Sequence, residues 1–452
     1  MENQSKRNLT LFTLTWPIFI EVLLHMLMGN ADTLMLSQYS DNSVAAVGVS
    51  NQILAFIIVM FGFVATGTAI LIAQNLGAKQ MKTASEIAVV SLGVNFVFSL
   101  GLSLIIFLLS ERILLLMDIP NELLEEAGVY LKIVGVFSFV QALIMTVGAI
   151  LRSYSFTRDV MYITIGMNIL NVIGNYFVIF GPFGFPILGV EGVAISTTIS
   201  RFLGLLAALI LLFNRVKGGF PLKFLYHFPK KHLKDLLRIG IPSAGEHLSY
   251  NGSQMVITYF IAILGTQALT AKVYAQNLMM FIFLFGIAIS QGTQILIGHM
   301  VGANEFSEAY KRCLKSLKLA VMISFCAALV FSFFSHQLLG IFTSDSEIIR
   351  VASTLILLTI LLEPGRSFNL VIINSLRAAG DVKFPVYMGI LSMWGVSVTL
   401  SYLLGIHFGL GLVGIWIAFI ADEWLRGLLM LWRWKSKVWM DKSFVKKIPS
   451  RS

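Results

Sequence analysis

Long apolar segments recur along the whole chain and constrain its fold more than any other feature. A helix needs about 20 apolar residues to cross the hydrocarbon core of a bilayer. Only 12% of the residues are charged, against about 25% in a soluble domain. Because backbone groups in lipid must be satisfied within their own segment, such segments form helices. The sequence therefore predicts an all-α polytopic membrane protein with twelve transmembrane helices, at about residues 11–36, 47–74, 88–110, 124–150, 158–180, 187–213, 236–264, 273–298, 312–335, 346–374, 382–405 and 410–434.

The distribution of Lys and Arg predicts the orientation of these helices. The two tails, the even-numbered connections and the span ends that adjoin them hold 26 of the 33 basic residues, and the odd-numbered connections hold three. Basic residues concentrate in cytoplasmic loops, so both termini are expected in the cytoplasm of a multi-pass cell-membrane protein, in a bacterium the inner membrane. The net charge of +10 is thereby explained without a nucleic-acid partner.

No cleavable signal peptide is expected, because the first apolar run is too long and contains acids.

The chain also repeats itself at a shift of 225 residues. This shift places Pro17 on Pro242 and Glu21 on Glu246, and it places Leu151-Arg152 on Leu376-Arg377. Each repeat has six spans, which predicts two parallel six-helix lobes related by a pseudo-two-fold axis along the membrane normal. The expected lobes are residues 1–213 and 236–452, joined by a basic cytoplasmic linker at 214–235. Two such lobes fit a transporter that works by alternating access.

The first span carries three ionisable residues, Glu21, His25 and Asp32. At about 100° per residue they fall on one helix face. A carboxylate in the bilayer has an unfavourable free energy unless it has an ion-pair partner or contacts water, so it is a candidate functional group. Glu21 and His25 can relay protons toward the cytoplasm, since His titrates near neutrality. The alternative is that they brace this helix against polar groups of neighbouring helices.

Several motifs in register resemble a known family of transporters. Pro17 followed by Asp32-Thr33 and later by Gly77-Ala78 resembles the first repeat of MATE (multidrug and toxic compound extrusion) transporters, and Leu376–Asp381 resembles their Leu-Arg-Gly-x-Gly-Asp loop. The resemblance covers the chain from Leu11 to about Trp434. It implies a secondary antiporter that exports organic, often cationic amphiphiles as H⁺ or Na⁺ enters.

The resemblance also implies an ion-coupling site in the first lobe. Its carboxylate is Asp32, and its partners are Asn171, Asn175 and Thr197. Family members often have a second carboxylate where this chain has Asn175. Na⁺ favours several charged oxygens, so a single carboxylate among neutral amides favours H⁺ as the coupling ion. The two asparagines, at i and i+4 on one helix face, can equally serve only as interhelical hydrogen-bonding groups.

In the second lobe, spacing predicts ion pairing rather than an ion site. Glu363 and Arg366 are i and i+3, and Asp422 and Arg426 are i and i+4, so each is expected to pair within its own helix. A substrate cleft is expected near Met28, Gln52, Tyr250, Gln276 and Asn277.

Other classes of function are less compatible with these residues. A flippase for a lipid-linked oligosaccharide, the alternative function, would need several unpaired Arg or Lys for a pyrophosphate. The sequence shows neither a clustered enzyme site nor a Gly-x-x-x-x-Gly-Lys-Ser/Thr loop for ATP. We expect no metal or cofactor, because no Cys or His cluster has ligand spacing. We expect a monomer that contacts lipid and small organic molecules.

Overall fold

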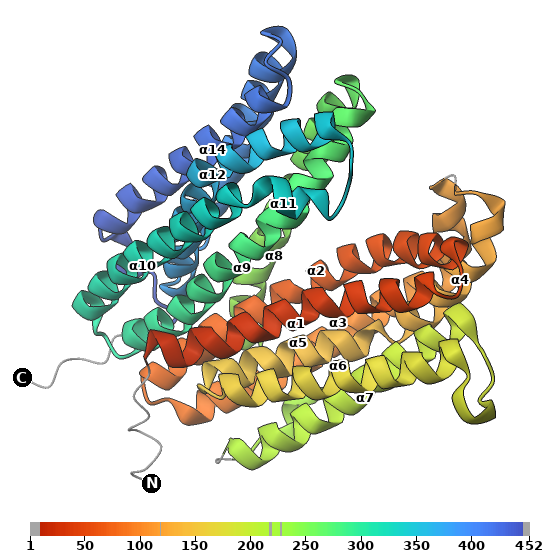
Figure 1. The fold of residues 1–452 in the computed structure, drawn as a ribbon. Coiled ribbons are helices and arrows are strands. Elements are labelled where there is room, and N and C mark those ends of the chain that lie inside the picture. The colour runs from red at the N-terminus through yellow and green to blue at the C-terminus, as the bar shows by residue number, and fades with distance from the viewer. Residues whose placement is uncertain (1–9, 118, 217–218, 227, 446–452) are drawn as a thin grey trace, which may run out of the picture. The chain divides into compact units, whose positions relative to one another are not determined.

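The computed structural model describes residues 10–117, 119–216, 219–226 and 228–445, and these residues are almost entirely helical, with no strand among them (Figure 1). Within this part of the chain, nine helices are long and apolar enough to cross a membrane, or ten when one bent pair is counted. The predicted all-α membrane fold is confirmed.

Each of the twelve predicted segments corresponds to a helix or to a broken helix. The first repeat contains α1 (Leu11–Ser37), α2 (Asp41–Gly77), α3 (Met81–Leu116), α4 (Asn121–Val136), α5 (Ser138–Ser153), α6 (Thr157–Phe180) and α7 (Gly189–Arg215). The second contains α8 (Lys230–Ile263), α9 (Thr266–Gly302), α10 (Phe306–Phe333), α11 (Ser335–Gly340), α12 (Ser346–Ala378), α13 (Lys383–Ser392) and α14 (Gly411–Lys435). Short 3₁₀ segments occur at Pro182–Gly184, Leu222–Leu225 and Val438–Asp441, and α13 continues through two π-helical segments, Met393–Val398 and Ser401–His407.

The fourth predicted segment is not one straight helix. It is divided into α4 and α5, which are bent by 43° at Phe137. On one side of the bend a Cβ at Gly135 would lie 2.6 Å from Ile106 Cγ2, and on the other the Ser138 and Ser103 hydroxyls are 3.0 Å apart. Helix α3 therefore holds both pieces where the segment breaks, a tertiary contact that hydropathy does not register.

The chain forms two compact units, each with its own apolar core. We call Ile20–Ile72 with Gln80–Gly240 the N-terminal unit. The C-terminal unit is Ile241–Ser452 with Ala73–Lys79 and the start of α1 up to Phe19. The lobe boundaries predicted from the repeat stay a prediction.

Within the C-terminal unit, the end of α2 lies against the end of α9 at glycines. A Cβ on Gly77 would collide with the carbonyl oxygen of His299, and a Cβ on Gly302 would collide with that of Gln74. Gly77 and Gly302 are 225 positions apart, and so are Gln74 and His299. The contact thus joins the same turn of the two repeats, and only residues without a side chain allow these backbones to approach so closely.

Replacing Gly302 by Ala is expected to lower the free energy of unfolding by about 1–3 kcal/mol, because the added methyl group meets backbone that cannot move aside. The effect can be measured as the unfolding midpoint of the purified protein. Gly101→Ala is the matched control, since a Cβ there meets nothing within 4 Å. Equal midpoints for the two variants would contradict the close approach of α2 and α9.

Candidate ion-coupling site

Four polar side chains of the N-terminal unit form one hydrogen-bonded chain. The Asn175 amide donates to Asp32 (Nδ2–Oδ1 2.6 Å) and lies 3.5 Å from Asn171 Oδ1. Asn171 in turn donates to the Thr197 hydroxyl (Nδ2–Oγ1 3.2 Å). All four residues are buried, with Asp32 7% exposed and both asparagines 0% exposed. The structure therefore brings together the residues that the family resemblance placed in one site, while their role in coupling stays a prediction.

The packing of α6 on α7 positions these groups. Gly174 lies between the two asparagines in the sequence, and Ser196 of α7 occupies the space that its side chain would need. The Ser196 hydroxyl donates to the Asn171 carbonyl oxygen at 3.2 Å. Because α6 lacks a side chain at this turn, Thr197 comes within hydrogen-bonding distance of Asn171.

Two further residues, which the family resemblance did not place in this site, adjoin Asp32. The guanidinium of Arg201 interacts electrostatically with Asp32, and its Nε is buried without a hydrogen-bond partner. The buried Tyr130 hydroxyl hydrogen-bonds to Asn51 and Thr197. Arg201 follows Thr197 by four residues, so its position on the same face of α7 was readable from the sequence. Its direction toward Asp32 was not, because that depends on how α7 packs against α1.

Glu21 is buried and pairs with Arg152 at the end of α5 (Nη1–Oε1 2.6 Å). The half-buried His25 interacts electrostatically with Glu21, Arg152 and Arg201. Ionisable groups therefore continue from Asp32 through Arg201 and His25 to Glu21. This arrangement is compatible with the predicted relay, although the ion pair also gives Glu21 the bracing role that was the alternative.

The C-terminal unit repeats this ion pair. Glu246 of α8 pairs with Arg377 of α12, and both residues lie 225 positions after Glu21 and Arg152. In each unit a carboxylate four residues after a helix proline thus meets the arginine of the Leu-Arg motif. The repeat aligns Glu21 with Glu246, and in the structure both residues form this ion pair.

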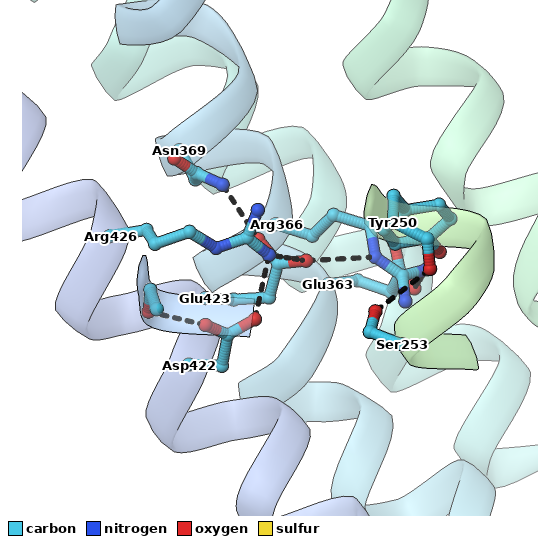
Figure 2. Close-up of polar contacts among 9 residues, drawn as sticks. Tyr250, Ser253, Glu363, Arg366, Asn369, Asp422, Glu423 and Arg426 are labelled. Atoms are coloured by element: carbon cyan, nitrogen blue, oxygen red, sulfur yellow. Dashed lines mark hydrogen bonds and ion pairs between the residues drawn. The ribbon is translucent and has the colours of Figure 1, made fainter. Parts of the chain in front are cut away.

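Deeper in the C-terminal unit, five charged side chains form one network, which we call the α12–α14 cluster (Figure 2). The expected pairs are present: Arg366 contacts Glu363 at 2.8 Å, and Arg426 contacts Asp422 at 2.8 Å. Glu423 joins them, because it lies 3.0 Å from Arg426 and 3.7 Å from Arg366. Asn369 donates to Glu423 at 2.9 Å, and Ser392 donates to Asp422 at 2.5 Å.

The five residues predicted for a substrate cleft belong to both units. Met28 is half-buried on α1 and Gln52 is exposed on α2, in the N-terminal unit. Tyr250 on α8 and Gln276 and Asn277 on α9 are exposed in the C-terminal unit. Their shared cleft stays a prediction.

A family model described as MatE matches residues 17–177 and 242–403, one block in each repeat. The chain belongs to the MatE family. It is 59% identical over 442 residues to the uncharacterized transporter YisQ of Bacillus subtilis, covering 98% of this chain and 97% of that one. It is 27% identical to a probable multidrug resistance protein NorM of Thermotoga maritima, covering 96% and 93% of the two chains.

Solved structures support the same fold for this MATE transporter. A MOP superfamily transporter from Pyrococcus furiosus matches with a TM-score of 0.86 at 20% identity, covering 96% of both chains. A variant of the Vibrio cholerae MATE transporter VcmN matches with a TM-score of 0.87 at 20% identity, covering 95% of this chain and 97% of that one. The predicted family and the twelve-helix fold are thereby confirmed.

Substituting Glu21 by Ala is expected to lower the free energy of unfolding by about 3 kcal/mol, because the half-buried Arg152 is left without its counter-charge. Unfolding midpoints of the purified variants provide the measurement, and the double variant with Arg152→Ala should recover part of the loss. Glu347→Ala is the control, since the Glu347–Arg350 side chains are 48% and 73% exposed and such pairs contribute at most about 1 kcal/mol. The buried pair has no stabilising role if Glu21→Ala and Glu347→Ala behave alike.

Proposed function

We propose that this MATE transporter exports organic cations and amphiphiles from the cell in exchange for H⁺, with Asp32 as the coupling carboxylate. The observation that carries the proposal is the buried carboxylate of Asp32, which accepts from Asn175 beside the guanidinium of Arg201. The substrate class rests on the relatives, several of which are named multidrug resistance proteins. Export, rather than uptake, follows the family resemblance and the predicted cytoplasmic termini.

The groups around Asp32 favour a proton over a metal ion. The Asn175 amide presents its N–H₂ group to the carboxylate, and Arg201 adds a positive charge nearby. Na⁺ would have to compete with that guanidinium and would need several oxygen ligands directed at one point. A proton binds to the carboxylate oxygen itself and needs no further ligand.

Protonation then has a defined local effect. The hydrogen bond from Asn175 to an ionised carboxylate is charge-assisted, so it weakens when Asp32 becomes neutral. Arg201 loses its counter-charge in the same step. Both changes loosen α1 from α6 and α7, and α1 is able to bend because Pro17 removes a backbone hydrogen bond within it. Ligands shift such an equilibrium only through different affinities for its two states, and a proton on Asp32 supplies that difference.

The flippase alternative gains no support from the arginines. Arg152, Arg366, Arg377 and Arg426 each have a carboxylate partner within 4 Å. Arg201 interacts with Asp32. A pyrophosphate would therefore have to displace a carboxylate from each guanidinium that binds it.

Asp32→Asn is expected to reduce export driven by a pH gradient at least about tenfold, because the amide cannot take up the coupling proton. The measurement is efflux of a cationic dye from proteoliposomes with an imposed pH gradient, compared with an imposed Na⁺ gradient. Asp41→Asn is the matched control, as Asp41 is an exposed carboxylate at the start of α2. Full pH-driven export by Asp32→Asn would contradict the proposal. Export by the wild type under a Na⁺ gradient alone would mean that the coupling ion is Na⁺ and not H⁺.

Asn175→Asp is expected to make export respond to Na⁺. The substitution places a second carboxylate against Asp32 and replaces an N–H₂ donor by an oxygen, which supplies the charged oxygens that a hard cation prefers. Dye efflux is measured with an imposed Na⁺ gradient at equal pH on both sides. Asn168→Asp is the control, because Asn168 donates to the Leu24 carbonyl oxygen rather than to Asp32. If neither variant responds to Na⁺, the amide at 175 does not determine ion choice.

A further inference from the structure

One buried cation of the C-terminal unit has no counter-charge among the described residues. Lys272 lies in the second turn of α9 and is 8% exposed, and its ammonium donates to the Thr258 hydroxyl of α8 (Nζ–Oγ1 2.6 Å). No acid of the described chain contributes an electrostatic interaction with this ammonium. One hydroxyl engages one of its three N–H donors and supplies no negative charge. Since a buried charge without compensation is costly in a membrane protein, an anion is missing here.

The internal repeat shows what the first half of the chain has at the same position. Lys272 lies 225 positions after Val47, which is 4% exposed in the apolar core of the N-terminal unit. The preceding residues, Ala46 and Ala271, are both 0% exposed, so the two positions correspond in the structure as well as in the sequence. An apolar side chain therefore satisfies the packing at this position, and packing does not account for the charge of the lysine.

The start of α9 also lacks the negative charge that the start of α2 has. Asp41 lies in the first turn of α2, and the Ser40 hydroxyl accepts from the backbone N–H of Ser43 at 3.4 Å. The corresponding residues of α9 are Gly265 and Thr266, and its first turn contains no acid. The first N–H groups of a helix have no partner within the helix and favour anions. Because glycine has no side chain to accept from them, the positive end of α9 is not compensated by its own residues.

Lys272 and this helix end are close enough to bind one ligand. Lys272 follows Thr266 by six residues, about 9 Å along the helix axis, and long side chains on a helix lean toward its N-terminus. A Cβ on Gly265 would meet nothing within 4 Å, so there is open space beside the turn that precedes α9. A ligand in that space can approach the first N–H groups of α9 and the lysine together.

The acids at the start of α12 do not supply the missing charge. Tyr274 of α9 stacks on Phe342, which precedes α12, with ring centroids 5.4 Å apart. Asp345 accepts from the first N–H groups of α12, and Glu347 pairs with Arg350. Both carboxylates are therefore engaged within their own helix.

We propose that this end of α8 and α9 binds a phosphate group, with Lys272 as its counter-charge and the first N–H groups of α9 as hydrogen-bond donors. Phosphate oxygens accept from ammonium groups and from helix N-termini. The exposed side chains of Tyr259 and Ile263 on α8 make an anionic phospholipid the expected source, because its acyl chains can cover apolar surface. The site involves neither Asp32 nor the α12–α14 cluster, goes beyond the proposed function and does not depend on it.

Native mass spectrometry of the purified, delipidated full-length protein, titrated with phosphatidylglycerol, tests the proposal. Lys272→Gln is expected to weaken the tightest lipid binding about tenfold, because a hydrogen bond to a charged group contributes roughly one decade of affinity. Lys272→Arg should retain it. Lys132→Gln is the control, since Lys132 already pairs with Glu111. Diacylglycerol with the same acyl chains should bind equally to wild type and Lys272→Gln, because it has no phosphate.

The source of the phosphate group is distinguished by a parallel titration with inorganic phosphate, followed by the ³¹P NMR linewidth. Broadening by the wild type that is lost in Lys272→Gln identifies free phosphate as a ligand of the site. Dependence on Lys272 for phosphatidylglycerol alone identifies the lipid. Equal binding of both probes by wild type and Lys272→Gln would overturn the proposal.

Thr266→Asp provides a second test that leaves Lys272 in place. This substitution gives α9 the acid that α2 has at the corresponding position, Asp41. The new carboxylate is expected to compete with the ligand and to weaken phosphatidylglycerol binding several-fold, while the neutral and isosteric Thr266→Asn should bind like the wild type. An acid in the first turn favours the helix, so loss of fold is not expected, and circular dichroism verifies it. Unchanged lipid binding by Thr266→Asp would contradict the placement of the phosphate at this helix end.

Discussion

An unpaired charge is too costly to leave in hydrocarbon, and the polar interior of this protein follows from that constraint. In each unit the Leu-Arg motif places an arginine in the last turn of a helix, and a carboxylate on the first helix of the repeat compensates it. The Glu21–Arg152 and Glu246–Arg377 pairs thereby fix the first helix of each repeat to the helix that ends in the Leu-Arg motif. These ion pairs thereby hold in place the helices that carry the other polar groups.

The two repeats share this ion pair and differ in their other buried polar residues. The N-terminal unit combines one carboxylate, Asp32, with two buried amides and one arginine. The C-terminal unit combines three carboxylates with two arginines. Since both copies derive their ion pair from the same repeat positions, the remaining polar residues are free to differ. This division explains how a repeated scaffold can carry two chemically distinct groups of buried polar residues.

Much of the fold could be predicted because the lengths of the apolar segments and the 225-residue repeat can both be read directly along the sequence. The register of Glu21 with Glu246 and of Arg152 with Arg377 was visible in the sequence, but the pairing of acid with arginine across about 130 residues was not. Spacing along one helix correctly predicted the Glu363–Arg366 and Asp422–Arg426 pairs. It could not reveal Glu423 as the bridge, Arg201 as the neighbour of Asp32, or the bend at Phe137, because each depends on which helices pack together.

Charge balance also connects the proposed site to antiport. The two acids Glu21 and Asp32 are matched by Arg152 and Arg201, so these four groups are neutral together when Asp32 is ionised. A proton on Asp32 leaves one uncompensated positive charge, and a cationic substrate that approaches this group of residues adds another. In a medium of low dielectric constant, two surplus positive charges cost far more than one. Under the proposed H⁺-coupled export, proton and cationic substrate therefore exclude each other electrostatically even without touching the same atom, and exchanging one for the other requires such mutual exclusion.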